Sequence, residues 1–252
     1  MLRIGLLGCG NIGHIIAQHA EGFVISAVYD KVSERAEEIA GICHGKAYDD
    51  FLAFLDADID LVVEAASVSA ARAHAKEVLL HKKNLVIMSV GALTDPAFKE
   101  DLVAAARKTD TKIYIPSGAI FGLDNLKIGQ ISPITKLLLK TTKSPQSLGL
   151  ETTSRQQIFS GKAHDCIKSY PKNVNVSVAM GLAAGQDADV ELWADPAADK
   201  NVHEIFIEGS FGETYIRVTN VPSPDNPATS YLAALSILSL LKNLDSPLVI
   251  GT

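Results

Sequence analysis

The chain of 252 residues has little of what marks a secreted or membrane protein. Its three cysteines, Cys9, Cys43 and Cys166, lie far apart and form no CxxC pair, so we expect no disulfide framework. No apolar run approaches the roughly 18–20 residues of a membrane span. Glycines interrupt the first apolar stretch before it reaches the length of a secretory signal. These absences predict a cytoplasmic protein with no membrane partner.

Positive charge is also scarce. The sequence has 23 Lys and Arg against 29 Asp and Glu, a net charge of −6. A protein that binds nucleic acid usually shows a basic excess or a basic face, so we expect no nucleic-acid partner. No group of His, Cys, Asp and Glu has metal-ligand spacing, so we expect no metal. Hydrophobic residues at 47% and charged residues at 21% are ordinary for a globular chain of one large or two modest domains.

The first half of the chain alternates short apolar runs with helical patterns. The runs are nearly continuous, as in strands that are buried on both faces. They are Leu2–Leu7, Phe23–Tyr29, Ile59–Glu64, Leu85–Met88 and Lys112–Ile115. Helices are expected after the first run, over Ser69–Lys82, and over Asp95–Lys108, where Asp95-Pro96 supplies a cap and a first-turn proline. This β-α-β order predicts an α/β fold whose N-terminal part is a doubly wound parallel sheet.

The pattern changes after about residue 116. Helices are expected over Ser160–Tyr170 and Val174–Ala184, and strands over Val190–Trp193, Val202–Glu208 and Thr214–Thr219. Consecutive strands favour a smaller α+β domain with a mostly antiparallel sheet. A last helix is expected over Thr229–Asn243, and we predict that it packs on the first domain. The expected domains are therefore residues 1–120, completed by 226–252, and residues 121–225.

A glycine-rich turn follows the first expected strand and opens a helix. The segment Gly8–Gly13 reads G-x-G-x-x-G. In a dinucleotide-binding unit, Gly8 would permit the tight turn, Gly10 the close approach of a pyrophosphate, and Gly13 the packing of helix on strand. Asp30 ends the second strand, twenty-two residues after Gly8, where an acidic side chain accepts hydrogen bonds from the adenosine ribose. We predict a Rossmann dinucleotide site.

The expected cofactor is NAD or NADP. Asp30 favours NAD, because a carboxylate repels a 2′-phosphate, whereas the nearby Lys31 and Arg35 leave NADP open. Small residues follow two further strands, at Ala65–Ser67 and Ser89–Ala92, where parallel sheets bind their ligands. From this region the predicted cofactor-binding residues are Gly8, Gly10, Asn11, Ile12, Gly13, Asp30, Ala66 and Ser67.

Several short segments, in this order and spacing, resemble those of one family. They include Ser89–Leu93, Pro116–Asp124, Phe159–Ala163, Tyr170–Val176, Asn201–Ile205, Asn220–Ser223 and Asn226–Ser230. Together with the glycine turn they make the chain similar to the archaeal and bacterial L-aspartate dehydrogenases, nearly from end to end. One departure is Ser154–Gln157, where that family often has Arg-Lys-Pro-Pro.

The resemblance implies an NAD(P)-dependent oxidoreductase acting on a CH–NH2 group. It implies oxidation of L-aspartate to iminoaspartate, which gives oxaloacetate after hydrolysis and feeds NAD biosynthesis, by a homodimer with a Rossmann domain and an α+β domain. It also implies that Ala119 and one of Asn173 and Asn175, preferably Asn175, contact the cofactor. The histidine of the Asn-x-His-Glu-Ile segment, His203, is the implied catalytic residue.

A histidine suits this chemistry because the substrate amine must lose a proton before hydride can leave. His164 is the alternative base. The alternative to a catalytic role for His203 is a purely structural role as a core residue. Candidates for binding the two substrate carboxylates are Arg155, Lys162, Lys168, Lys172 and Lys200. Two other functions remain open: another two-domain reductase of the dihydrodipicolinate or homoserine type, and a non-enzymatic NAD-binding sensor.

Overall fold

The computed structural model describes residues 1–170, 175–223 and 226–250, and the chain divides into two compact units. Unit 1 comprises Met1–Pro116 and Ala234–Ile250, and unit 2 comprises Ser117–Ala233. In the part of the chain that the structure describes, no helix has both the length and the apolar character that crossing a membrane requires.

Unit 1 is built on a six-stranded parallel sheet of order β3-β2-β1-β4-β5-β6. This is the strand order typical of dinucleotide-binding folds. The strands are β1 (Leu2–Leu7), β2 (Phe23–Tyr29), β3 (Lys46–Tyr48), β4 (Leu61–Glu64), β5 (Asn84–Ile87) and β6 (Ile113–Tyr114). The helical segments are α1 (Asn11–Gln18), α2 (Ser33–Cys43), α3 (Phe51–Leu55), α4 (Val68–Leu80), η1 (Val90–Thr94), α5 (Pro96–Thr109) and, from Ala234 onward, α9 (Tyr231–Leu244).

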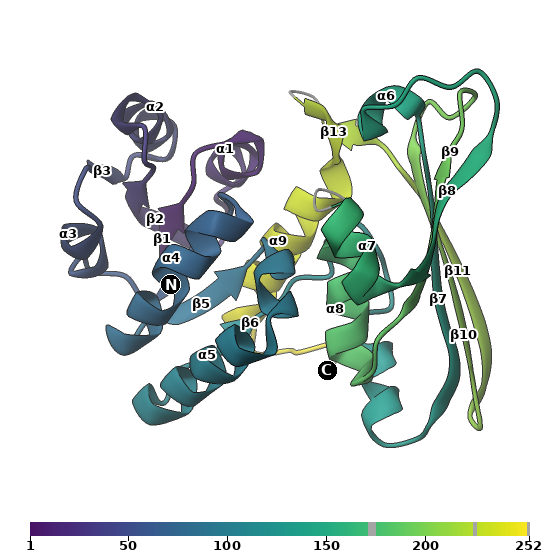
Figure 1. Ribbon diagram of the computed structural model, residues 1–252. Coiled ribbons are helices and arrows are strands. Elements are labelled where there is room, and N and C mark those ends of the chain that lie inside the picture. The colour runs from purple at the N-terminus through teal and green to yellow at the C-terminus, as the bar shows by residue number, and fades with distance from the viewer. Residues whose placement is uncertain (171–174, 224–225, 251–252) are drawn as a thin grey trace. The chain divides into compact units, whose positions relative to one another are not determined.

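The order of the strands reverses between β1 and β4. The connections through α1 and α2 run one way from β1, and those through α4 and α5 run the other way from β4 (Figure 1). Because such crossovers are right-handed, the two pairs of helices cover opposite faces of the sheet. The reversal opens a crevice at the carboxyl ends of β1 and β4, which is where sheets of this kind bind ligands.

The sequence predicted β1 and β2 to the residue and β4, β5 and β6 to within two residues at either end. The expected start of α5 is also confirmed: Asp95 Oδ1 accepts hydrogen bonds from the backbone N–H groups of Ala97 and Phe98, and Pro96 occupies the first turn. Not predicted were α2, α3 and β3. Strand β3 is a three-residue edge strand, too short to show a periodicity.

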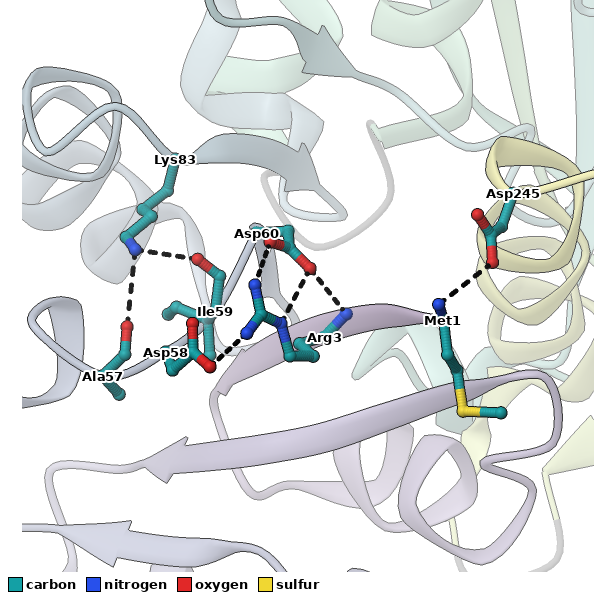
Figure 2. Close-up of polar contacts among 8 residues, drawn as sticks. All are labelled: Met1, Arg3, Ala57, Asp58, Ile59, Asp60, Lys83 and Asp245. Carbon is teal, nitrogen blue, oxygen red and sulfur yellow. Dashed lines mark hydrogen bonds and ion pairs between the residues drawn. The ribbon is translucent and has the colours of Figure 1, made fainter.

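At the other end of the strands, where β1 and β4 begin, partly exposed ion pairs join the two chain segments (Figure 2). Arg3 donates to Asp60 through its backbone N–H, Nε and Nη2, and its Nη1 contacts Asp58. Lys83 Nζ donates to the Ile59 carbonyl at 2.8 Å. The Arg3 guanidinium lowers the pKa of the Asp60 carboxyl. These contacts fasten the amino ends of the strands and leave the carboxyl ends for the site.

Unit 2 contains a five-stranded sheet of order β11-β10-β7-β9-β8, in which only the β7–β9 pair is parallel. Its strands are β7 (Ile134–Lys143), β8 (Gln156–Lys162), β9 (Asp189–Ala194), β10 (Asn201–Gly209) and β11 (Gly212–Asn220). Its helical segments are η2 (Asn125–Gln130), α6 (Pro145–Leu148), α7 (Ala163–Ser169) and α8 (Asn175–Ala184). The short strands β12 (Pro222–Ser223) and β13 (Asn226–Ser230) form a separate ribbon. The mostly antiparallel second sheet is thereby confirmed.

Several details of unit 2 differ from the sequence prediction. Strands β8, β12 and β13 were not predicted, and the last helix begins at Tyr231 and not at Thr229, because Asn226–Ser230 form β13. The helix expected from Ser160 begins at Ala163, because Ser160, Gly161 and Lys162 pair with β9 as the end of β8. The central strand β7 was missed altogether. Its sequence ITKLLLKTTK places three leucines in a row between polar residues, which is neither a clean alternation nor a continuous apolar run.

One face of this second sheet is buried, and α7 and α8 lie on that side of the sheet in Figure 1. The buried face changes character along the strands. At one end it is apolar, with Leu137, Leu139, Ile205 and Ile207 in the core of the unit. At the other end the buried side chains are polar: Thr141, Lys143, Asn201, His203 and Asn220. A core that becomes polar at one end of its sheet is a candidate site, because burying such groups is costly.

Candidate active site

The glycine-rich turn of unit 1 has the geometry that its sequence predicts. Gly8 has a φ of +106°, and a Cβ built there would lie 2.6 Å from the Cβ of Ala66. A Cβ on Gly13 would lie 2.3 Å from the Gly8 carbonyl oxygen. Gly10 is different, because nothing lies within 4 Å of the Cβ it lacks. Two of the glycines are therefore required by packing, while the third keeps space free over the start of α1.

The start of α1 is open to an anion. Its cap residue Gly10 provides no side-chain hydrogen bond, and the first turn contains no acidic residue. Asn11 and Ile12 are the first two residues of this helix, so their backbone N–H groups lie at its positive end. This arrangement fits a pyrophosphate, because helix N-termini bind phosphate through free N–H groups.

Asp30 follows β2, the neighbour of β1, and its side chain is fixed by the backbone of the glycine turn and of its own loop. Its Oδ2 accepts from the N–H of Cys9 at 2.7 Å, and its Oδ1 accepts from the N–H of Val32 at 3.0 Å. Each carboxylate oxygen has further lone-pair capacity, so the side chain is fixed in position and can still accept from ribose hydroxyls. Cys9 is buried, and its burial raises the thiol pKa to about 12, so it fills the turn as an inert thiol.

A cavity of about 390 Å³ collects these groups at the carboxyl ends of β1, β2 and β4. Five of the predicted cofactor residues line it: Gly8, Gly10, Asp30, Ala66 and Ser67. Residues that were not predicted as ligands also line it, including Tyr29, Ser69, Ala70 and His74. The His74 ring lies 4.0 Å from that of Phe51, so an aromatic group forms part of this wall. Lys31 and Arg35 line the same cavity.

A buried carboxylate holds two of the turns around this crevice. Glu64 ends β4; its Oε1 accepts from the N–H groups of Ala66 and Ser67 and from Ser89 Oγ, and its Oε2 accepts from the Ser89 N–H. These four bonds are 2.8–3.0 Å long. Burial raises the pKa of Glu64, and the four donors oppose that rise. Glu64 therefore fixes the backbone of cavity residues without lining the cavity itself.

His203 lies in the polar end of the buried face of unit 2. It is 5% exposed, and its Nδ1 shares a 2.9 Å hydrogen bond with Oγ1 of Thr141, its direct partner across the β10–β7 pair. The sequence did not predict this partner, because β7 was not recognised. Lys143 follows two residues later on the same face of β7 and is also buried.

Burial lowers the pKa values of both titratable groups in this cluster. Burial lowers the pKa of His203 to about 3, and the positive charge of Lys143 adds to this effect. Burial lowers the pKa of Lys143 to about 8. The imidazole is therefore neutral at physiological pH in the free protein, and a negative group that pairs with Lys143 removes part of what holds the imidazole neutral.

The other predicted residues lie in unit 2 or outside the described residues. Ala119 is buried, and Asn175 is the exposed first residue of α8. The alternatives Asn173 and Lys172 lie outside the described residues. His164 is exposed and lies between the carboxylates of Asp165 and Asp187.

The cations proposed for the substrate carboxylates are less suitable than Lys143. Lys162 pairs with Asp189, and Lys168 pairs with Asp165, both on the surface. Arg155 pairs with Asp195 and covers the ring of Trp193, while Lys200 is exposed. Among the described residues, no cluster of three or more His, Cys, Asp or Glu side chains could hold a metal ion.

The comparisons with known proteins cover both units. Residues 4–116 match the family model described as homoserine dehydrogenase, NAD binding domain, and residues 124–244 match aspartate dehydrogenase, C-terminal. The second match is what separates this chain from reductases that share only the first unit.

Full-length relatives agree. The chain is 60% identical to the L-aspartate dehydrogenase of Methanospirillum hungatei over 252 residues and 42% identical to that of Methanothermobacter thermautotrophicus over 260 residues, covering at least 99% of each chain. The crystal structure of aspartate dehydrogenase from Thermotoga maritima superposes with a TM-score of 0.84 at 29% identity and covers 100% of both chains. The glycine turn, the buried histidine and these matches over the whole length show that the chain belongs to the L-aspartate dehydrogenase family.

Proposed function

We propose that this protein is an NAD(P)-dependent L-aspartate dehydrogenase. It oxidises L-aspartate to iminoaspartate, which hydrolyses to oxaloacetate or serves NAD biosynthesis. The observation that carries the proposal is the buried cluster of His203, Thr141 and Lys143, in a chain 60% identical to a protein of that name. Unit 1 acts as the dinucleotide-binding domain and unit 2 as the substrate and dimerisation domain.

In this proposal the residues of unit 2 bind the substrate and handle its proton. Lys143 pairs with a substrate carboxylate, because it is a buried cation close enough to lower the pKa of His203. Thr141 fixes the imidazole through Nδ1 and directs Nε2 at the amine. Once the carboxylate neutralises Lys143, the basicity of His203 rises, so the base is activated when substrate is present. When bound, the nicotinamide accepts the hydride from Cα.

The residues of unit 1 bind the cofactor. Gly10 leaves the space for the pyrophosphate, Asn11 and Ile12 supply N–H groups at the start of α1, and Gly13 allows the helix to pack closely. Ala119 and Asn175 of unit 2 remain proposed cofactor contacts. NAD is the preferred cofactor, since the fixed Asp30 carboxylate accepts from ribose hydroxyls and repels a 2′-phosphate.

The cofactor preference is tested by Asp30→Asn. We expect the ratio of kcat/KM for NAD to that for NADP to fall about tenfold, because the variant removes the repulsion and leaves Lys31 and Arg35 beside the 2′ position. Asp50→Asn, at a helix cap outside the cavity lining, is the matched control. An unchanged ratio in Asp30→Asn contradicts the role given to this carboxylate.

The protein is also proposed to act as a homodimer in the cytoplasm. The side of the second sheet opposite its core carries Phe206 and Tyr215, whose ring centroids lie 4.9 Å apart, and Tyr215 is 53% exposed. These rings lie beside the ion pairs of Lys136 with Glu208 and of Lys140 with Glu204, and exposed aromatic groups on a sheet face support a self-association surface. The three free cysteines suit a reducing compartment. Light scattering of the purified protein tests the dimer, and a monomeric mass refutes it.

The activity itself is tested by mixing the protein with L-aspartate and either NAD or NADP at alkaline pH. Formation of reduced nicotinamide is followed by absorbance, with D-aspartate, L-glutamate and L-homoserine in parallel. We expect turnover with L-aspartate above all the others. Cofactor binding without turnover of any substrate contradicts the proposal and favours a sensor.

A further inference from the structure

Asn220 presents a buried oxygen that nothing in the described protein satisfies. It is the last residue of β11 and is 2% exposed. Its Nδ2 donates to the Ala119 carbonyl at 3.1 Å. Its Oδ1 is the single buried side-chain nitrogen or oxygen within residues 1–170, 175–223 and 226–250 that lacks a hydrogen-bond partner. Native proteins leave few such atoms, because an unpaired buried acceptor is costly.

The orientation of this amide is determined by its surroundings. A carbonyl oxygen only accepts, so the end of the Asn220 side chain that faces Ala119 is the NH2 group. Flipping the amide would bring two oxygens together and leave the NH2 group unpaired. The oxygen therefore faces away from Ala119, and any group that satisfies it has to be a donor.

The register places this acceptor beside His203. Asn220 pairs with Asn201, and His203 pairs with Val218, so Asn220 and His203 are diagonal neighbours on the buried face. Diagonal neighbours in an antiparallel pair lie roughly 7–8 Å apart between Cα atoms. The side chains themselves approach more closely than the Cα atoms, and two hydrogen bonds of ordinary length to one nitrogen join acceptors about 5 Å apart. A single amino group is therefore able to contact both side chains.

We propose that Asn220 Oδ1 accepts a hydrogen bond from the amino nitrogen of the substrate and so selects an amine over a carbon or ether at that position. This inference rests on the proposed function. As the Cα–H bond breaks and its electron pair leaves as hydride for the nicotinamide, the nitrogen lone pair forms the C=N bond and the nitrogen becomes positive. Its N–H is then a stronger donor, so the bond to Oδ1 strengthens toward the transition state.

The test compares two dicarboxylates that differ in the amino group. The affinity of L-aspartate and of succinate is measured by calorimetry with the reduced cofactor bound, so that L-aspartate is not oxidised. In Asn220→Ala we expect the affinity for L-aspartate to fall about tenfold or more and that for succinate to change less than threefold. A purely structural role for Asn220 would weaken both ligands alike.

Two further variants sharpen this test. Asn220→Asp retains an acceptor, so it should keep more of the preference for L-aspartate than Asn220→Ala does, even if its added charge weakens both dicarboxylates. Asn84→Ala is the control, because Asn84 Oδ1 accepts only a backbone N–H, that of Lys112, in unit 1. Equal losses for both ligands in Asn220→Ala overturn the inference and leave Asn220 with a structural role. If the wild-type protein fails to oxidise L-aspartate, the proposed function itself is wrong, and the inference falls with it.

Discussion

Each unit buries polar side chains at one end of a sheet, but the two clusters are satisfied to different degrees. In unit 1, Glu64 has four donors within 3.0 Å, three of them backbone N–H groups. In unit 2, His203 shares one hydrogen bond with Thr141, Lys143 is a buried cation, and Asn220 has an oxygen without a partner. The first cluster is complete within the protein, whereas the second leaves the Asn220 oxygen without a donor.

This difference in hydrogen bonding suggests different roles for the two clusters: the Glu64 cluster positions backbone, and the His203 cluster is the candidate for the chemical step. A carboxylate whose bonds all go to its own chain fixes backbone, and Glu64 does so for Ala66, Ser67 and Ser89. A buried cluster with displaced pKa values is a candidate for binding substrate and moving protons, which is the role we propose for His203, Thr141 and Lys143. The following variants test this contrast, beginning with the largest expected effect.

The largest effect is expected from His203→Ala. Removing the proposed base should lower kcat by about 10²–10⁴-fold, as is typical for general base catalysis. The affinity for the dinucleotide should stay the same, because its cavity is lined by unit 1. Steady-state kinetics and a binding titration measure the two quantities. His164→Ala is the control, since that ring is exposed between two carboxylates, and loss of turnover in this variant alone would reassign the base.

The second prediction concerns the stability of the protein at acidic pH. The pKa of His203 is about 3 in the folded protein and near 6.5 when unfolded, so the unfolded state binds more protons between these values. The free energy of unfolding should therefore decrease as the pH falls from about 6.5 toward 3, by roughly 4–5 kcal/mol in all. His203→Gln should flatten this decrease in urea unfolding followed at several pH values. A slope as steep as that of the wild type would show that the imidazole is not buried neutral.

Glu64→Gln should have a smaller effect, and of another kind. The amide NH2 would face at least one of the four donors, so we expect a loss of about 1–3 kcal/mol in unfolding free energy. Dinucleotide affinity should weaken severalfold as the turns relax, with kcat at saturating cofactor nearly unchanged. A variant that binds cofactor normally but has a kcat reduced a hundredfold would place Glu64 in the chemistry.

The smallest effect is expected from Arg3→Ala, at the amino end of β1 and away from the cavity. Asp58 is exposed and Arg3 and Asp60 are partly exposed, and ion pairs in contact with solvent contribute little. We expect a slight decrease in Tm that shrinks as salt is added, with activity unchanged. Because the pKa of Asp60 is lowered in the folded protein, its carboxylate stabilises the fold at pH values above the usual aspartate pKa. This stabilisation is lost as the pH falls through the lower pKa of the folded state. A large, salt-independent loss would contradict this assignment.

The sequence predicted unit 1 better than unit 2, for a physical reason. Parallel strands buried on both faces are nearly continuous apolar runs in the sequence. The turn is also visible in the sequence, because Gly8 has a positive φ that glycine adopts far more readily than other residues. The buried face of β7 instead carries Thr141 and Lys143, which read as surface residues in a single sequence. Its neighbours β9 and β10 lie far along the chain, so nothing local indicates that it is central.

For the site the same contrast holds. The spacing of Gly8, Gly10 and Asp30 predicted a cavity that the structure assembles. His203 was identified only through the family segment around it, since a buried histidine on an alternating strand is ordinary. Lys143 was missed, and Asn220 was noted only as part of a family segment. The significance of these two residues depends on burial and on an unpaired atom, which only the three-dimensional structure shows.

The course of the last helix has a consequence for how the chain is made. Residues from Ala234 onward belong to unit 1, with Lys242 paired to Glu21 and Asp245 near the amino group of Met1 (Figure 2). On a ribosome, the segment Met1–Pro116 emerges first, but the residues that complete it emerge last. All of unit 2 is therefore synthesised before the last helix of unit 1 is available. Unit 1 can begin to fold first, but it is completed only after unit 2 has been synthesised.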